Sequence, residues 1–266
     1  MELRATEEYR ARGLGEQVIS RLGLFGDMLL AVQANVSAIR DPAEIETLHF
    51  LDCLSLLELA EVRAARRIAD VGSGGGLPAV VLALVLPEAR VVAVESVRRK
   101  CDFVRGAARS LGLENLEVAC VRAEDYGRSP ARESFDAVVA RAVASLPVLA
   151  ELCVPLVRAG GVFVAMKGAM SDQERIPGRR ALAILGAETL QESRARSFAG
   201  AENRWLYVAY KTRNTPDRYP RRAGMPVKRP LGSSAEPGST GHGEQPPRPG
   251  KAIREATRQG GRRRGR

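Results

Sequence analysis

The sequence predicts an α/β protein built on a mostly parallel β-sheet with helices on both faces. From Arg67 onward, short runs rich in β-branched residues alternate with segments of helical length. Strands separated by helices favour a parallel sheet, because each helix returns the chain to the end where the previous strand began. The last two strand-like runs are joined without an obvious helix, so we expect the sheet to end in an antiparallel hairpin.

The expected elements follow one another in a regular order. Residues 1–62 are predicted to be helical, because apolar residues at positions 22, 25, 28, 29 and 32 have helix-like spacing and Asp41 before Pro42 is typical of a helix start. Residues 63–211 are assigned to the α/β core. Its strands are expected at residues 68–71, 91–95, 116–121, 135–140, 162–166, 188–192 and 205–210, and its helices at residues 77–86, 98–111, 147–157 and 171–185.

The chain has a net charge of +10, and the whole surplus lies after residue 211. Residues 212–266 hold 14 Lys or Arg against 4 Asp or Glu, which leaves 27 of each sign in residues 1–211. Residues 212–231 form a predicted basic segment, and residues 232–266 lack periodicity and are predicted to be disordered. A basic tail suits a polyanionic partner, because Arg and Lys neutralise phosphates and release counterions. A merely solubilising extension is the other interpretation of this composition.

Composition and cysteine usage argue against several classes of protein. No apolar run is long enough to span a bilayer, and the N-terminus lacks the apolar region of an export signal. The four cysteines are scattered singly, no C-x-x-C pair occurs, and the chain has two histidines. We therefore expect a cytoplasmic protein with buried, reduced thiols, no membrane segment and no metal.

The strongest local signal is D-V-G-S-G-G-G-L-P at residues 70–78, between the first strand and the next helix. Glycines permit positive φ angles and let the backbone approach a ligand, and a helix N-terminus attracts a carboxylate or a phosphate. S-adenosylmethionine carries such a carboxylate. A nicotinamide dinucleotide also fits, because residues 74, 76 and 79 match the looser G-x-G-x-x-A pattern. From the loop we expect cofactor contacts at Gly72, Ser73, Gly74 and Gly76.

Two further features follow the second and third strands. Glu95 ends the second strand, where ligands of open α/β sheets bind and where an acid accepts hydrogen bonds from a ribose diol. This placement suits adenosine in either cofactor. Ala123, Glu124 and Asp125 follow the third strand, where methyltransferases hold adenine. An ordinary surface helix cap is the other interpretation of these three residues.

Nine short motifs stand in register along most of the chain. They are N-V-S-A-I-R-D-P at residues 35–42, H-F-L-D-C-L at 49–54, the loop at 70–78, E-S at 95–96 with basic residues 98–100, R-A-E at 122–124, A-R-A-V-A-S-L at 140–146, P-L at 155–156 with G-G at 160–161, M-K-G at 166–168, and Y-P-R-R-A-G-M-P at 219–226. Together they resemble the bacterial small-subunit rRNA guanine-N7 methyltransferase G family. The chain departs from the family's usual Trp-Asn and aromatic residues at Leu30, Ala31 and Ala34, and residues 232–266 exceed its usual length.

The resemblance implies a fold, a cofactor and a reaction. The fold is a Rossmann-like class I methyltransferase with a seven-stranded sheet and an N-terminal helical cap. The reaction is methyl transfer from S-adenosylmethionine to N7 of a guanine in 16S rRNA, taken as free RNA or in the small ribosomal subunit, and we expect the enzyme to be a monomer. The implied cofactor contacts are Gly72, Leu77, Glu95, Ser96, Val97, Ala123, Glu124 and Arg141.

This reaction needs no general base, because guanine N7 carries a lone pair and no proton. No catalytic acid or base is therefore predicted, and catalysis should depend on aligning nitrogen, methyl carbon and sulfur. Arg141 and Lys167, at strand ends on the ligand side, are expected to orient substrate or cofactor. For Lys167, a solvated strand end is the other interpretation. Arg221 and Arg222 are expected to contact the RNA.

Some alternatives stay open at the level of sequence. His49 and Asp52, spaced i, i+3 on a predicted helix, either line the mouth of the active site or make hydrogen bonds within the cap; we favour the second interpretation, because a lone His is a weak signal. The chain could also methylate another RNA, a protein or a small molecule. A nicotinamide-dependent oxidoreductase is a more distant alternative.

Overall fold

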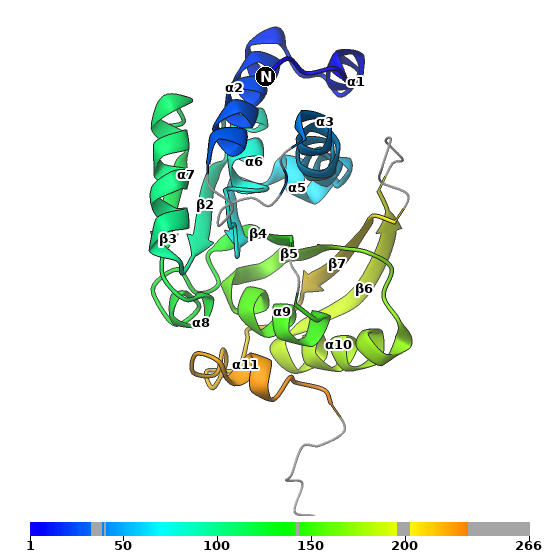
Figure 1. Ribbon diagram of the computed structural model, residues 1–266. Coiled ribbons are helices and arrows are strands. Elements are labelled where there is room, and N and C mark those ends of the chain that lie inside the picture. The colour runs from blue at the N-terminus through cyan, green and yellow to red at the C-terminus, as the bar shows by residue number, and fades with distance from the viewer. Residues whose placement is uncertain (33–38, 40, 142–143, 196–202, 234–266) are drawn as a thin grey trace, which may run out of the picture. The chain divides into compact units, whose positions relative to one another are not determined.

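Seven strands form one sheet in the order β3-β2-β1-β4-β5-β7-β6 (Figure 1), within the residues that this computed structural model describes: 1–32, 39, 41–141, 144–195 and 203–233. The strands are β1 (Arg67–Val71), β2 (Arg90–Glu95), β3 (Leu116–Cys120), β4 (Phe135–Arg141), β5 (Val157–Lys167), β6 (Ala187–Arg194) and β7 (Trp205–Lys211). Strands β1 to β5 pair in parallel, whereas β7 lies between β5 and β6 and is antiparallel to both. The expected parallel sheet with an antiparallel hairpin is therefore confirmed.

Helices connect the strands and build the N-terminal cap. The α-helices are α1 (Thr6–Ala11), α2 (Glu16–Ala31), α3 (Pro42–Ile45), α4 (Asp52–Leu54), α5 (Ala60–Ala64), α6 (Ala79–Val85), α7 (Arg98–Ser110), α8 (Ala123–Tyr126), α9 (Leu146–Cys153), α10 (Asp172–Leu185) and α11 (Met225–Lys228). A π-helical turn η1 (Glu46–Leu51) and two 3₁₀ turns, η2 (Ser55–Glu58) and η3 (Val154–Leu156), complete the described set.

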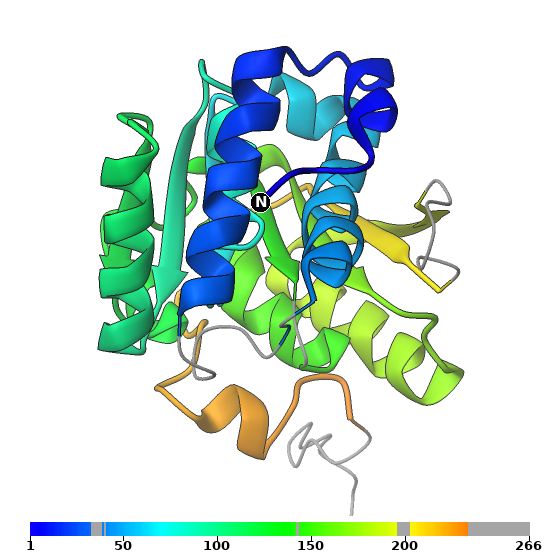
Figure 2. The same ribbon diagram turned by 45° about the horizontal axis from the view of Figure 1, so that its top comes forward.

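Both faces of the sheet are covered by helices. Along β4, Ala137 and Val139 belong to the core that includes α6 and α7, while Val138 and Ala140 belong to the core that includes α9 and α10. Successive side chains of a strand point to opposite faces, so a strand buried on both faces must be apolar at nearly every position. Figures 1 and 2 show α2, α6 and α7 on one side of the sheet and α9 and α10 on the other.

The cap packs on the same face as α6. Helix α2 contributes the buried Phe25, whose ring lies 5.9 Å from that of Phe50 in η1. Asp41 begins α3 as expected: its side chain accepts a hydrogen bond from the Ala43 amide (2.8 Å). Residues 33–38 and 40, which include most of the motif at 35–42, lie outside the described residues. The cap thus carries η1 and α4 over one end of the sheet.

Several expected boundaries differ from the structure. The helix expected at residues 147–157 ends at Cys153 and continues as the 3₁₀ turn η3, because Pro155 lacks the N–H group that would extend the helix. Residues from Val157 onward instead join β5, which is longer than expected and runs through Gly160 and Gly161. The helix expected at 77–86 begins at Ala79, so residues 77 and 78 belong to the glycine loop.

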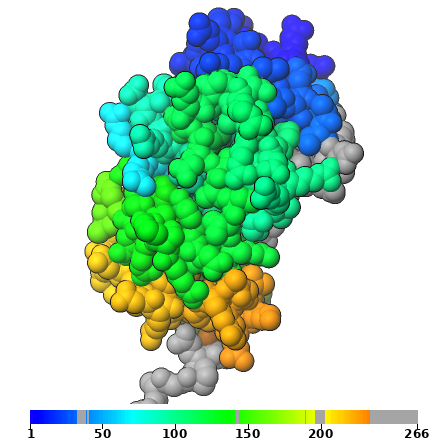
Figure 3. All heavy atoms as spheres, turned by 90° about the vertical axis from the view of Figure 1, so that its left-hand side faces the viewer, coloured from blue at the N-terminus to red at the C-terminus, as the bar shows by residue number. Residues whose placement is uncertain are grey.

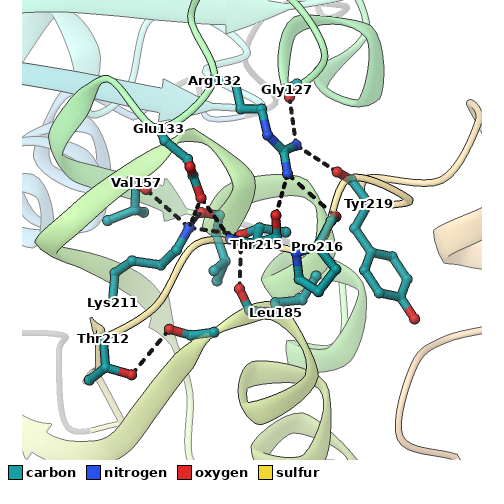
Figure 4. A network of polar contacts seen from close by, with 12 residues as sticks. Gly127, Arg132, Glu133, Val157, Leu185, Lys211, Thr212, Thr215, Pro216 and Tyr219 are labelled. Carbon is teal, nitrogen blue, oxygen red and sulfur yellow. Dashed lines mark hydrogen bonds and ion pairs between the residues drawn. The ribbon is translucent and has the colours of Figure 1, made fainter.

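A buried polar network fastens the chain after β7 to the body of the protein (Figure 4). Lys211 Nζ donates to Glu133 Oε1 (3.0 Å) and to Thr215 Oγ1 (2.7 Å). Arg132 donates to the carbonyl oxygens of Thr215 and Tyr219 (both 2.6 Å). Residues 212–231, called the C-terminal segment below, are therefore packed against the core.

The cap, the core and the C-terminal segment belong to one compact unit. The chain from residue 234 onward, which holds nearly all of the predicted disordered tail, lies outside the described residues. Within the described part of the chain, every helix is too short or too polar to cross a lipid bilayer.

Candidate active site

The glycine loop joins β1 to α6 at the carboxyl edge of the parallel strands. Gly72, Gly74 and Gly76 have φ angles of 78°, 56° and 87°, in the region that favours glycine. A Cβ atom at Gly72 would meet no atom within 4 Å, and one at Gly74 would meet only a backbone oxygen 3.9 Å away. A Cβ atom at Gly76 would lie 2.7 Å from Val80 Cγ2. Gly72 and Gly74 therefore leave room for a ligand, whereas Gly76 allows the loop to pack on α6.

Two buried polar side chains at this loop have an atom without a hydrogen-bond partner among the described residues. Asp70 accepts a hydrogen bond from the Ala79 amide through Oδ2 (3.0 Å), but neither Asp70 Oδ1 nor Ser73 Oγ has a partner. Burial raises the pKa of Asp70 to about 7. Buried polar atoms are normally paired, so the loop offers an unused acceptor and an unused hydroxyl to the polar groups of a ligand.

Glu95 lies at the end of β2 and contacts the glycine loop. Its Oε2 accepts a hydrogen bond from the Gly74 amide (3.0 Å), and its Oε1 accepts from the amides of Ser96 and Val97 (both 2.8 Å). Val97 itself is 48% exposed. Three parts of the predicted cofactor site are thus brought together: the loop, the acid after the second strand, and the turn that follows it.

The predicted adenine region at Ala123 and Glu124 forms the first turn of α8. Glu124 is buried, and its Oε1 accepts a hydrogen bond from the Gly224 amide (2.9 Å) in the C-terminal segment. This carboxylate is therefore already paired within the protein. The backbone at residues 123 and 124 is then the part of this turn that remains suited to a base.

A second feature of the site is a cavity of about 520 Å³ between the cap and the ends of β4 and β5. Arg141, the last residue of β4, donates from Nη1 to the Leu48 carbonyl oxygen (3.0 Å) and lies 3.2 Å from His49 Nδ1. Asp52 is flanked by two guanidinium groups, with Arg141 Nη1 3.6 Å from Oδ2 and Arg204 Nε 3.5 Å from Oδ1. His49 and Asp52 thus both line the cavity and bond to other residues.

The opposite wall of the cavity contains Lys167 at the end of β5. Its Nζ donates to the Ala144 carbonyl oxygen (2.7 Å) and lies 2.9 Å from Glu174 Oε1. The Leu146 amide donates to the same carboxylate oxygen (2.7 Å). The Lys167 side chain is 12% exposed, so it is a paired residue of the cavity wall and not a solvated strand end.

Burial sets the charge states in the cavity. Burial, together with the charge of the nearby Arg141, lowers the pKa of His49 to about 4. Burial also raises the pKa of Asp52, against which the charges of Arg141 and Arg204 act. His49 is therefore neutral near pH 7. Within the described residues, no group of three or more His, Cys, Asp or Glu side chains is placed to hold a metal ion.

Two charged residues of this cavity were not predicted from the sequence. Arg204 stands just before β7, and Glu174 lies in the first turn of α10. Neither is linked to Asp52 by any spacing in the sequence. One signal was present for Arg204: because β7 is antiparallel, its first residues lie at the carboxyl edge of the parallel strands, where ligands bind.

The two residues expected to contact RNA differ in their surroundings. Arg221 pairs with the fully buried carboxylate of Glu151 through Nε (2.8 Å) and Nη2 (2.6 Å), and its amide donates to the same group (2.8 Å). We therefore reassign Arg221 from RNA contact to anchoring the C-terminal segment on α9. Arg222 is exposed.

The strand order with an antiparallel β7, the glycine loop after β1 and the acid after β2 define a Rossmann-like class I methyltransferase. A solved structure with this fold is that of the S-adenosylmethionine-dependent methyltransferase SibL in its apo form. The likeness has a TM-score of 0.53 at 13% identity and covers 77% of this chain and 72% of that chain.

Comparison with curated relatives identifies the family to which the chain belongs within this fold class. Residues 20–198 match the family described as rRNA small subunit methyltransferase G. The ribosomal RNA small subunit methyltransferase G of Rubrobacter xylanophilus is 50% identical over 203 residues, which cover 75% of this chain and 78% of that protein. The corresponding protein of Desulfitobacterium hafniense is 40% identical over 220 residues, which cover 82% of this chain and 90% of that protein. The chain belongs to the rRNA small subunit methyltransferase G family, which sets aside the nicotinamide-dependent alternative.

Proposed function

We propose that this chain transfers a methyl group from S-adenosylmethionine to N7 of a specific guanine in 16S rRNA. The observation that carries the proposal is a cavity lined by both acidic and basic side chains next to the cofactor loop, in a chain of the rRNA small subunit methyltransferase G family. Arg141 connects the cavity with the cofactor loop. It ends β4, which pairs with β1, and its positive charge acts on Asp70 at the end of β1.

The residues around the glycine loop fit the cofactor. When bound, S-adenosylmethionine supplies an electrophilic methyl group on a sulfonium. We assign its amino-acid part to the backbone at Gly72 and Gly74, with Asp70 Oδ1 and Ser73 Oγ as polar partners. The ribose and the base are assigned to Glu95, the turn at Ser96 and Val97, the backbone of Ala123 and Glu124, and the neighbouring Leu77.

The cavity residues suit a nucleophile that needs no deprotonation. Arg141 and Lys167 are held by hydrogen bonds to the Leu48 and Ala144 carbonyl oxygens, so each keeps a fixed position. The base becomes cationic as N7 accepts the methyl group, and a neutral His49 adds no charge against that step. The protein then contributes alignment, with reacting atoms about 3–3.5 Å apart, rather than proton transfer.

The RNA is assigned to exposed basic residues beside α8. The Gly224–Glu124 hydrogen bond places the C-terminal segment against this helix, and in Figure 3 the orange atoms of the segment lie directly against green atoms of the core. Exposed Lys and Arg attract phosphates and release counterions. The exposed basic residues here are Arg122, Arg128, Arg218, Arg222, Lys228 and Arg229. We place the reaction in the cytoplasm, where ribosomal RNA is found, and assign it to a monomer.

The test is to map the methyl group on the RNA. The purified chain is incubated with labelled S-adenosylmethionine and with 30S subunits, free 16S rRNA or free 23S rRNA, and modified positions are located by borohydride reduction and aniline cleavage, which cuts at N7-methylguanine. The proposal expects one cleaved guanine in 16S rRNA, from one or both of its forms. Methyl transfer to 23S rRNA alone, or to an atom that does not sensitise a guanine to cleavage, would contradict it.

A further inference from the structure

We propose that Asp52 recognises the target base by accepting hydrogen bonds from its N1–H and N2–H groups in the cavity between the cap and the ends of β4 and β5. This inference rests on the proposed function and deepens it, because it names the residue that selects guanine. Asp52 was expected to make contacts within the cap. Instead it lies in the wall of the cavity, with 4% of its surface exposed.

The cavity has the size and the position of a base-binding site. Its volume of about 520 Å³ falls within the range of small-molecule sites, about 300–1,000 Å³. One wall comes from the cap and the other from the carboxyl ends of β4 and β5, where ligands of such sheets bind. A base that enters here comes next to Arg141, whose strand is the sheet neighbour of β1 and its glycine loop.

Guanine alone among the four bases presents two adjacent donors on its pairing edge. A carboxylate can accept a hydrogen bond from each of these two donors. It cannot do so with adenine or cytosine, because each of these bases has an acceptor at the corresponding ring nitrogen. The pairing edge lies away from N7, so contact there leaves the nucleophile free. An Arg that reads guanine through O6 and N7 would instead block methylation. A carboxylate is therefore better suited than an Arg to recognise the guanine in this reaction.

Both carboxylate oxygens of Asp52 keep accepting capacity, whereas Glu174 has one oxygen that is closely engaged. Glu174 Oε1 is engaged at short distances by Lys167 (2.9 Å) and by the Leu146 amide (2.7 Å). The two guanidinium groups beside Asp52 stand at 3.6 and 3.5 Å, one at each oxygen, which is longer than a good hydrogen bond. The two positive charges favour the ionised form of Asp52, which burial disfavours. Both carboxylate oxygens can still accept hydrogen bonds.

The same contact assists the chemical step. Methylation puts positive charge on the purine, so its N1–H and N2–H groups become stronger donors as the reaction proceeds. A carboxylate bonded to them holds the transition state more tightly than the ground state, which is the condition for catalysis. Loss of Asp52 should therefore lower kcat as well as weaken selection.

The experiment pairs a protein variant with an altered base. The full chain is compared as wild type, Asp52→Asn and Glu174→Gln, the last removing one charge from the same cavity. Substrates are 16S rRNAs, assembled by splinted ligation, with guanosine or inosine at the mapped target. Inosine keeps N7, O6 and N1–H and lacks only the 2-amino group. Cofactor affinity is measured by calorimetry for each protein.

The two changes should be coupled, because they remove the same contact. We expect inosine to lower kcat/KM of the wild type and of Glu174→Gln by about 10-fold, which corresponds to one charge-assisted hydrogen bond. Asp52→Asn should lower kcat/KM on guanosine by roughly 100-fold. In this variant, replacing guanosine with inosine should change kcat/KM by less than about 2-fold. Its cofactor affinity should equal that of the wild type.

Each contrary outcome has a distinct meaning. An Asp52→Asn enzyme with the full inosine penalty would overturn the inference, and so would loss of cofactor binding in that variant. Should this variant not fold, the wild type alone still decides, because equal rates on guanosine and inosine would also overturn the inference. A wild type that modifies neither RNA, free or assembled into 30S subunits, would overturn the proposed function itself.

Discussion

At the scale of single residues, the glycine loop contains buried polar groups whose hydrogen bonding is incomplete among the described residues. Asp70 is fully buried and accepts a hydrogen bond from the Ala79 amide through one carboxylate oxygen, while the other has no partner among the described residues. A buried charge with an unused acceptor destabilises the fold unless something binds it. Such local conflicts with packing are expected at functional sites, and this one stands beside Gly72 and Gly74, the two glycines with open space around them.

Asp70→Asn is expected to stabilise the ligand-free protein at neutral and higher pH. The pKa of Asp70 is raised to about 7 in the folded chain and is about 3.9 when unfolded. Between these values the folded state binds more protons, so wild-type stability falls as pH rises through this window. The advantage of the variant should therefore be small near pH 4 and grow toward pH 7, by at most about 1.4 kcal/mol per pH unit.

Chemical denaturation of both proteins at several pH values, without cofactor, measures this difference. Calorimetry with S-adenosylmethionine should show weaker binding to the variant, because Asn removes the unpaired carboxylate oxygen. A stability difference that does not change with pH would contradict the assigned cost of burying this charge.

At the scale of elements, polar contacts made by a few side chains hold the C-terminal segment against the core. Arg221 pairs with the fully buried Glu151, and Lys211 and Arg132 fasten the start of the segment (Figure 4). Buried ion pairs add little net stability when they are complete, but removing one partner leaves an uncompensated charge. Adjacent arginines can therefore have opposite roles, with Arg221 anchoring the segment and Arg222 facing solvent.

Arg221→Met should lower the free energy of unfolding by about 3 kcal/mol, because the buried Glu151 would lose its charged partner and keep only the backbone amide at position 221. Arg222→Met is the matched control and should change stability by less than about 0.5 kcal/mol, while weakening binding to 16S rRNA. Thermal denaturation and RNA-binding titrations on both variants test the pair. Equal losses of stability in the two proteins would disprove the assignment of Arg221 as the anchor.

At the scale of the whole molecule, half of the surplus positive charge lies in the tail and the other half in the C-terminal segment. Residues 234–266 hold eight Lys or Arg against three Glu, whereas residues 1–211 are neutral overall. The residues proposed to bind the cofactor and the target base lie in the compact unit that includes the cap, the core and the C-terminal segment. We therefore expect the tail to strengthen binding to any polyanion without choosing the base that is methylated.

A chain truncated after Ser233 should keep cofactor affinity and modify the same guanine, but bind RNA more weakly at low salt. Each phosphate that the truncated chain no longer neutralises should reduce the slope of log affinity against log salt by about 0.7–0.9. Titrations of full-length and truncated protein across a range of salt concentrations, with mapping of the methylated position, make the comparison. An unchanged slope would mean that the tail takes no part in binding, and a shifted position would mean that it contributes to specificity.

Local patterns were enough to predict most of the fold and the elements that carry the glycine loop, Glu95 and the turn after it. Apolar runs such as that of β4 and the glycine spacing of the loop are local properties, because strand and helix periods and positive φ angles depend on a few neighbouring residues. The sequence by itself determined the alternation of strands and helices, the antiparallel hairpin, and the loop with Glu95 beyond the next strand. The motifs also determined the family.

Only the tertiary structure decided which side chains share a cavity and which are used for packing. Asp52 and Arg204 come from the cap and from the start of β7, and Arg221 and Glu151 are 70 residues apart, so no period or spacing connects them. Gly76 and Gly74 look alike in the sequence, but they lack a side chain for different reasons. At Gly76 a Cβ atom would collide with Val80, whereas at Gly74 the space beside the backbone is open. The physical reason is that burial and pairing depend on distant segments, whose approach is set by how the two faces of the sheet are packed.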